Sequence, residues 1–356
     1  MTRQKAEGRR QKARGLVSAL CLLPFALTAG GEPQRGITAA SVVAKAYDTI
    51  LDADFDRLAA DLKTVCGPAP PVACLGLEAL SLWWQIQLDP ESRARDAAFL
   101  AKTNAAIAEA ERLTEAEPER AEAWFYLGAA YGVRAQWRVL RVERLAAARD
   151  GKRIKVSLEQ ALALDPSMHD AEFGVGMYRY YADVAPAYLR WLRWLLQLPG
   201  GNRVEGLQQL ERAARQGELV RGEAQYQIHV LYLWYEERWR DALAIVLDLQ
   251  SRYPHNPHFR QIEAEIRDVY SHDPAASLKA SEQLLALARS GAVHRAGLAE
   301  VAARLNMARQ FRALGQRERA LEELNAIIAL APSAPAGALA RAQRMRRELR
   351  TPRTPG

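Results

Sequence analysis

Four arginines recur at helical spacing in the middle of the chain. Arg134, Arg138, Arg141 and Arg144 are separated by four, three and three residues, and Trp137 lies among them. On an α-helix these arginines fall within a stripe about 120° wide. Guanidinium groups bind carboxylates and phosphates in a bidentate manner. The stripe therefore predicts a partner-binding face for an anionic ligand, which would be an acidic peptide, a phosphate or an anionic lipid.

This basic stretch also has a purely structural interpretation. The same arginines would pair with Glu143, Glu159 and neighbouring acids on a solvated face, and Trp137 would belong to the core. The sequence alone leaves both interpretations open.

Other polar residues offer little chemistry by their spacing. His255 and His258 lie in a loop without metal-ligand spacing. Glu236-Glu237 and Asp183 could make an acid–base pair, but their positions favour a turn between hairpins for Glu236-Glu237 and a helix start for Asp183. No serine–histidine–aspartate pattern, zinc motif or nucleotide loop occurs. We therefore expect no catalysis, no metal site and no cofactor.

The cysteines suggest a disulfide and an oxidising compartment. Cys66 and Cys74 enclose seven residues, three of them proline, and the third cysteine, Cys21, lies near the N-terminus. Such a stiff loop suits a disulfide in an exported protein. The alternative is two free, partly buried thiols.

The elements that must carry these residues are helices. Ala, Leu, Arg, Glu and Gln dominate, apolar residues recur every three or four positions, and alternating Val-rich runs are absent. Pro and Gly divide the chain into segments about as long as a helix or a helical hairpin. We predict an all-α fold without strands.

One segment shows the signature of a helical repeat. Trp124, Leu127, Gly128 and Tyr131 have the spacing W-x2-L-G-x2-Y, which resembles the first helix of a tetratricopeptide repeat. The closing proline, Pro166, comes 14 residues late, close to four helical turns, which predicts a lengthened hairpin. The resemblance implies stacked hairpins in a right-handed superhelix, a solenoid.

Two further units fit this repeat without insertion. One begins at Glu223 and the other at Val301. Their signature positions are Ala242 and Pro254 in the first unit, and Gly315, Ala320 and Pro332 in the second. Segment 335–350 is expected to be a closing helix.

The middle third of the chain has a distinct pattern of residues. It contains, in order, Tyr180-Tyr181, Pro186, an apolar segment at 189–196, the turn Pro199-Gly-Gly-Asn-Arg203 and Gly206-Leu207. This order resembles the divergent tetratricopeptide family linked to mitochondrial outer membranes and to inclusion-body or lipid handling. The resemblance covers about residues 120–270 and implies a helical scaffold with no catalytic residue.

The N-terminus resembles an export signal. Six basic residues precede Leu16, and about 14 apolar residues then run to Ala29. The formal charge of +7 is confined to the ends, because residues 1–29 and 341–356 each carry +5 and residues 30–340 carry −3. We expect an exported, periplasmic or envelope-associated protein, with the signal cleaved or kept as an anchor, and no nucleic-acid partner.

These features predict four regions and one main function. The regions are a signal peptide (1–29), an aromatic-rich helical module (30–270), C-terminal hairpins with a closing helix (271–350) and a disordered tail (351–356). We expect a non-enzymatic scaffold that holds a protein or peptide partner in a concave groove. The alternative function is an envelope protein that binds or processes glycan or lipid, as an enzyme or its accessory subunit.

Overall fold

The computed structural model describes residues 36–184, 200–331 and 334–351. The predicted signal peptide, the apolar segment at 189–196, Pro332 and the last five residues lie outside the described residues.

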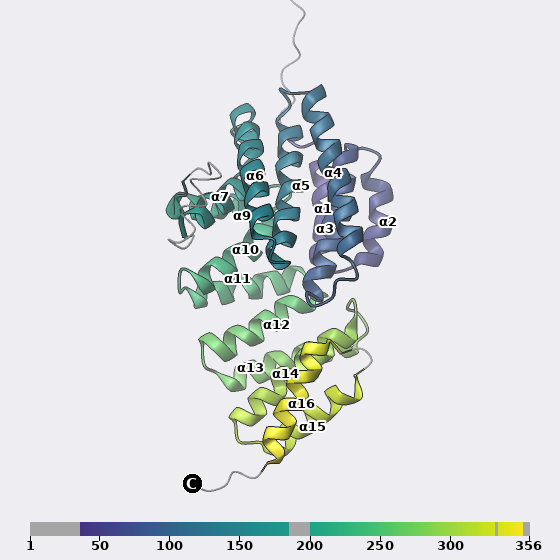
Figure 1. Ribbon diagram of the computed structural model, residues 1–356, viewed down its shortest axis with the longest axis vertical. Coiled ribbons are helices and arrows are strands. Elements are labelled where there is room, and N and C mark those ends of the chain that lie inside the picture. Colours follow the sequence, from purple (N-terminus) through teal and green to yellow (C-terminus); the bar gives the residue numbers. More distant parts are fainter. Residues whose placement is uncertain (1–35, 185–199, 332–333, 352–356) are drawn as a thin grey trace, which may run out of the picture. The chain divides into compact units, whose positions relative to one another are not determined.

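The described residues form helices and no strand, which confirms the all-α prediction (Figure 1). The bounds are α1 Ala40–Leu51, α2 Phe55–Val65, α3 Pro71–Leu88, α4 Asp96–Ala116, α5 Ala121–Leu140, α6 Arg144–Leu164, α7 His169–Val184, α9 Arg203–Gln216, α10 Arg221–Trp234, α11 Trp239–Arg252, α12 Pro257–Glu265, the π-helix η2 Ile266–Tyr270, α13 Pro274–Arg289, α14 Ala296–Ala313, α15 Arg317–Ala329 and α16 Ala336–Arg350.

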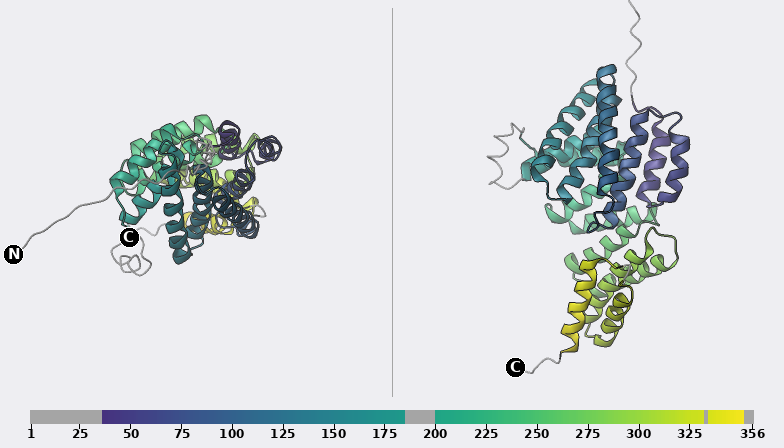
Figure 2. Two further views of the ribbon diagram at one scale, coloured as in Figure 1. Left: turned by 90° about the horizontal axis from the view of Figure 1, so that it is seen from above. Right: turned by 45° about the vertical axis from the view of Figure 1, so that its right-hand side comes forward.

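The helices follow one another as hairpins. The first helices are α1, α3, α5, α7, α10, α12 and α14, and each packs against the second helix of its own pair: α2, α4, α6, α9, α11, α13 and α15. Second helices also pack against the first helix of the next pair, and α16, yellow in Figure 2, closes the series against α14 and α15. This is the helical-hairpin array of a solenoid.

The hairpin α5/α6 is long, as is α3/α4, whose helices have 18 and 21 residues. The helices α5 and α6 have 20 and 21 residues, against 14 each in α10 and α11. A Cβ at Gly128 would lie 2.5 Å from the side chain of Leu158 in α6, and a Cβ at Gly174 in α7 would also meet Leu158. Leu158 thus fills a slot between two glycines, because only a residue without a Cβ leaves it room. Tyr131, also in α5, is buried, and Pro166 lies just after the end of α6.

The remaining repeat positions lie at helix contacts and turns. Ala242 in α11 and Ala320 in α15 are fully buried. Gly315 connects α14 to α15 with a φ of +75°, a conformation that favours glycine. Pro254 lies in the turn between α11 and α12. Trp124 is only partly buried and donates its indole N–H to the carbonyl of Pro118.

The apolar core changes near residue 270. One continuous cluster of buried side chains runs from Val43 to Ile266, and two smaller clusters follow between Leu284 and Ala342. The π-helix η2 lies at this change, although α12 and α13 still pack against each other across it. By residue contacts, residues 34–356 form one unit.

The end of α1, in the first hairpin, contacts residues that follow the fifth hairpin. Tyr253 donates its hydroxyl to Asp48 at 2.6 Å, and Asn256 donates its amide to the carbonyl of Leu51 at 2.7 Å. Since α1 also contacts α10, the inner face of the first five hairpins is bounded on this side.

Candidate functional site

Two arginines of the predicted stripe converge on one buried acid. Arg134 reaches Asp150 with two hydrogen bonds of 2.9 and 3.0 Å, and Arg138 reaches the same carboxylate at 2.6 Å. Asp150 is fully buried and Arg134 is 9% exposed. Arg134 also donates to Asn104 in α4. This cluster ties α5 to α6 and α4.

A third arginine of the stripe is committed in the same way. Arg141 donates twice to Asp96, at 2.7 and 2.8 Å, and to the carbonyls of Pro90 and Ser92. The buried Trp137 donates to the same carboxylate at 3.1 Å. Burial opposes ionisation of Asp96, but the hydrogen bonds from Arg141 and Trp137 keep its pKa below the usual range.

The stripe is therefore engaged inside the protein. Its acids are Asp150 and Asp96, with Glu143 a more distant contact of Arg138 at 3.8 Å. Arg144 alone is exposed and has no ion-pair partner among the described residues. Arg134, Arg138 and Arg141 therefore hold α4, α5 and α6 together from within.

The two cysteines lie close enough to be joined. Cys66 follows α2 and Cys74 lies in α3, with their Cα atoms 5.8 Å apart and a disulfide between them. The bond fastens the loop between the first two hairpins.

The acids considered for catalysis, Glu236 and Asp183, connect α7, the start of α9 and the end of α10 through hydrogen bonds. Glu236 accepts from Arg203 at 2.7 Å and from the Tyr180 hydroxyl at 2.6 Å, and the hydrogen bond from Arg203 is the main cause of its lowered pKa. Asp183 accepts the backbone N–H of Arg203. Asp183 lies near the end of α7 rather than at a helix start. Through these contacts Glu236 and Asp183 hold helices together, which is a structural role and differs from that of an acid–base pair.

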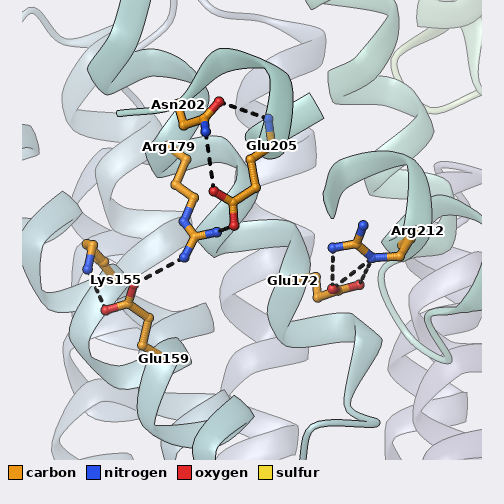
Figure 3. Close-up of polar contacts among 7 residues, drawn as sticks. All are labelled: Lys155, Glu159, Glu172, Arg179, Asn202, Glu205 and Arg212. Carbon is orange, nitrogen blue, oxygen red and sulfur yellow. Dashed lines mark hydrogen bonds and ion pairs between the residues drawn. The ribbon is translucent and has the colours of Figure 1, made fainter. Parts of the chain in front are cut away.

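A network of ion pairs and hydrogen bonds connects the neighbouring helices in the same way (Figure 3). Arg179 bridges Glu205 and Glu159, so that it links α9, α7 and α6. Arg212 holds Glu172 at 2.7 Å, again between α9 and α7. The hairpin α7/α9 is thus cross-linked to α6 by charge as well as by packing.

An open groove lies in the C-terminal half. It has a volume of about 730 Å³ and is lined by the segment after α3, by α12, α13, α14 and by α16. Its lining includes apolar side chains, among them Leu298, Val301, Leu305 and Met345. Helices from several hairpins thus share one concave surface.

Arginines line this groove in two pairs. Arg309 and Arg312 come from α14, and Arg341 and Arg344 come from α16. Arg312 pairs with Glu348 at 3.0 Å, and the side chains of both are at least half exposed. Arg344 is exposed and has no ion-pair partner in the described part of the chain.

Acidic residues of the segment after α3 line another part of the groove. Glu91 accepts the backbone N–H of Gly337 at 3.1 Å, at the N-terminus of α16, and lies 3.8 Å from Arg341. Asp89 pairs with Arg295 just before α14. Glu91 lies where the dipole of α16 favours a negative charge. Farther along the groove, Arg309 lies 3.5 Å from Asp268 and Arg312 pairs with Glu348, and both arginine side chains are about half exposed.

Sequence reasoning missed these arginines. Arg309 and Arg312, like Arg341 and Arg344, have the three-residue spacing that drew attention to the middle stripe. The signal was present, but spacing does not distinguish an arginine with a buried acid beside it from one that faces a groove.

His258 lines the groove, and His229 lies in the core beside it. His258 contacts the Tyr226 hydroxyl at 3.0 Å, and burial lowers its pKa to about 4. His229 is 3% exposed, lies against the carbonyl of Tyr226, and has a pKa lowered by burial to about 3. Both are neutral at neutral pH and belong to the aromatic core around Trp84.

The described residues contain no group of three or more His, Cys, Asp or Glu side chains arranged to hold a metal ion. None of the helices in the described ranges combines the length and apolarity needed to cross a bilayer.

Comparisons with known proteins give likenesses of fold only. No family model and no curated protein matches the chain by sequence. Among solved structures, the chain is similar to the C-terminal part of a TPR repeat-containing protein from Cytophaga hutchinsonii, with a TM-score of 0.43, 13% identity and coverage of 84% of this chain and 98% of the other. It is also similar to a monomeric mutant of IFIT1 with Gppp-AAAA, with a TM-score of 0.39, 11% identity and coverage of 88% and 83%. The class of this protein, an all-α array of helical hairpins, rests on the packing described above.

Proposed function

We propose that this chain is an exported, non-enzymatic scaffold that binds a protein partner in the groove between α12, α14 and α16. The observation that supports the proposal is the groove of about 730 Å³, whose lining combines apolar side chains with four arginines, of which Arg344 has no ion-pair partner among the described residues. The charged residues of the α5 stripe and of the network around α7 and α9 pair mainly with one another.

The groove suits an extended peptide that carries both acidic and apolar residues. Apolar side chains of the peptide would cover Leu298, Leu305 and Met345, and its carboxylates would approach Arg309 and Arg344. Helical-repeat proteins present extended concave surfaces of this kind. Export is proposed from the N-terminal sequence, and the resemblance of residues 120–270 to a divergent tetratricopeptide family stays a hypothesis.

The test uses the full chain as bait in an envelope extract of the source cells, with cross-linking and mass spectrometry. The variant carries Arg309→Glu and Arg344→Glu, and the control carries Arg317→Glu, an exposed arginine of α15 outside the groove. We expect one dominant partner, cross-linked beside the groove, that the double variant loses and the control keeps. A partner kept by the double variant, or glycan or lipid retained in place of protein, would contradict the proposal.

A further inference from the structure

The side of α6 that faces solvent is strongly positive. Three exposed cations there have no ion-pair partner among the described residues: Arg144, Arg149 and Lys152. The acids nearest to them in sequence are engaged, because Asp150 is buried against Arg138 and Glu143 lies 3.8 Å from the same arginine. Since residues 30–340 carry a net charge of −3, this side of one helix is a local exception.

Apolar side chains lie among these cations. Four exposed residues of α6 follow one another at spacings of four, three and four: Leu145, Arg149, Lys152 and Val156. This spacing places them along one face of the helix, over a length of about 17 Å. The helix packs against α5 and α7 on its other sides. We call these four residues, together with Arg144, the outer face of α6.

The turn before α6 adds two more exposed valines. Val139 and Val142 are each 66% exposed. Val142 has a φ of +66° just after the end of α5, and the N–H of Glu143 donates to the carbonyl of Arg138 at 2.8 Å. Glycine is the usual residue at this position of a helix end, and a β-branched residue is strained there. An exposed valine in a strained conformation adds little to the stability of the fold, which indicates that another requirement keeps it.

These features suit a flat, anionic surface. Protein partners are held by aromatic and arginine anchors in closed pockets, whereas the apolar residues here are separate aliphatic side chains, and none of them lines the groove. An anionic lipid bilayer attracts each nearby Lys or Arg, which strengthens binding by about fivefold per residue. Aliphatic side chains enter the boundary between its headgroups and acyl chains. The outer face and the turn therefore match a bilayer better than a folded protein.

We propose that the outer face of α6, with the turn at Val139 and Val142, docks on the surface of an anionic lipid bilayer. Arg149 and Lys152 approach the headgroup phosphates, and Val142 reaches the boundary beneath them. The residues concerned are separate from those that line the groove, so this docking is independent of the scaffold function proposed above.

Binding of the full chain to vesicles tests the charge. Vesicles that contain phosphatidylglycerol are compared with vesicles of phosphatidylcholine alone by flotation, and the ratio of the two affinities is measured. Each variant is compared with the parent chain, so that the basic and apolar N-terminal segment contributes equally to both. Arg149→Gln with Lys152→Gln should lower the ratio about 25-fold, because two cations are lost.

The control for charge is Lys279→Gln with Arg317→Gln, two exposed cations of α13 and α15. It removes the same charge from the chain and should leave the ratio unchanged. A parent chain without preference for anionic vesicles would overturn the proposal, and so would an equal fall in the two double variants.

Replacing the valines distinguishes a bilayer from a soluble polyanion. Val139→Gln with Val142→Asn removes both apolar side chains, and asparagine tolerates the conformation of residue 142. We expect binding to anionic vesicles to weaken about tenfold, with no loss of thermal stability. The matched control, Val204→Gln with Val269→Gln, changes two exposed valines on other helices and should bind as the parent does. Undiminished binding by the folded Val139→Gln, Val142→Asn variant would show that the face suits a soluble polyanion such as an acidic peptide, and would overturn the proposal.

Discussion

At the scale of single residues, buried partners decide what each charge does. Asp150 is a single carboxylate that receives two guanidinium groups, and Asp96 receives a third together with an indole N–H. Ion pairs of this kind stabilise little by themselves, but the loss of one partner leaves an uncompensated buried charge.

Asp150→Asn should lower the free energy of unfolding by about 3–5 kcal/mol, because Arg134 and Arg138 would lose their common counter-charge. Urea denaturation followed by circular dichroism measures this. Glu143→Gln is the control, since Glu143 is exposed and lies 3.8 Å from Arg138, and it should change stability by less than about 0.5 kcal/mol. Equal effects of the two substitutions would show that the buried cluster is not what holds α5 to α6.

His229 should make stability depend on mildly acidic pH. Its pKa is about 3 in the folded chain and about 6.5 when unfolded. Between these values only the unfolded state takes up the proton, so stability falls as pH falls below about 6.5. Between pH 7 and 5 this one group should cost about 2 kcal/mol. Unfolding experiments at both pH values should show a smaller loss for His229→Gln than for the parent chain, and the exposed His272→Gln should leave the loss unchanged.

At the scale of helices, glycine positions record how closely two helices approach. A Cβ at Gly206 in α9 would lie 2.7 Å from the carbonyl oxygen of Gly176 and from the backbone nitrogen of Tyr180, both in α7. Backbone atoms cannot move aside as the end of a flexible side chain can. The hairpin α7/α9 therefore depends on glycine at the contact.

Gly206→Ala should destabilise the chain by about 1–3 kcal/mol, even though alanine favours a helix more than glycine does. Gly151→Ala, at a helical position with room for a methyl group, should instead stabilise by up to about 1 kcal/mol. Thermal unfolding of the two variants compares them directly. A stabilised Gly206→Ala variant would mean that α7 and α9 can separate without cost.

At the scale of the whole described array, contacts between distant parts of the sequence bound its inner face. Asn256 is 1% exposed, donates to the carbonyl of Leu51, and accepts the N–H of His258 at the start of α12. One side chain thus connects the end of α1 to α12, although about two hundred residues separate them along the chain.

Asn256→Ala should lower stability by roughly 2–4 kcal/mol, because it leaves a buried carbonyl unpaired and removes a helix cap. Hydrogen exchange should accelerate in the last turn of α1 as well as in α12. His255→Ala, beside it, removes an exposed contact with Asp52 and should leave exchange in α12 unchanged. Acceleration in α12 alone would show that the first hairpin is held without this contact.

Local patterns by themselves determined the class of fold. The spacing of apolar residues, the Pro and Gly breaks and the Trp124 to Tyr131 signature predicted hairpins at the places where α5/α6, α10/α11 and α14/α15 lie. They succeeded because helix formation and hairpin packing depend on residues three, four and about 34 positions apart. Even the lengthened hairpin follows from the late Pro166.

Only the tertiary structure decided which of these residues face a ligand. Arg138 and Arg312 look alike in sequence, yet Arg138 meets a buried acid in the next helix, whereas Arg312 lines a groove and pairs with the exposed Glu348. Nothing local marks Gly132 as different from Gly128, yet a Cβ at Gly128 would meet Leu158 and a Cβ at Gly132 would meet no atom within 4 Å. Burial, pairing and empty space are properties of what the rest of the chain places around a residue, and its near neighbours in sequence do not encode them.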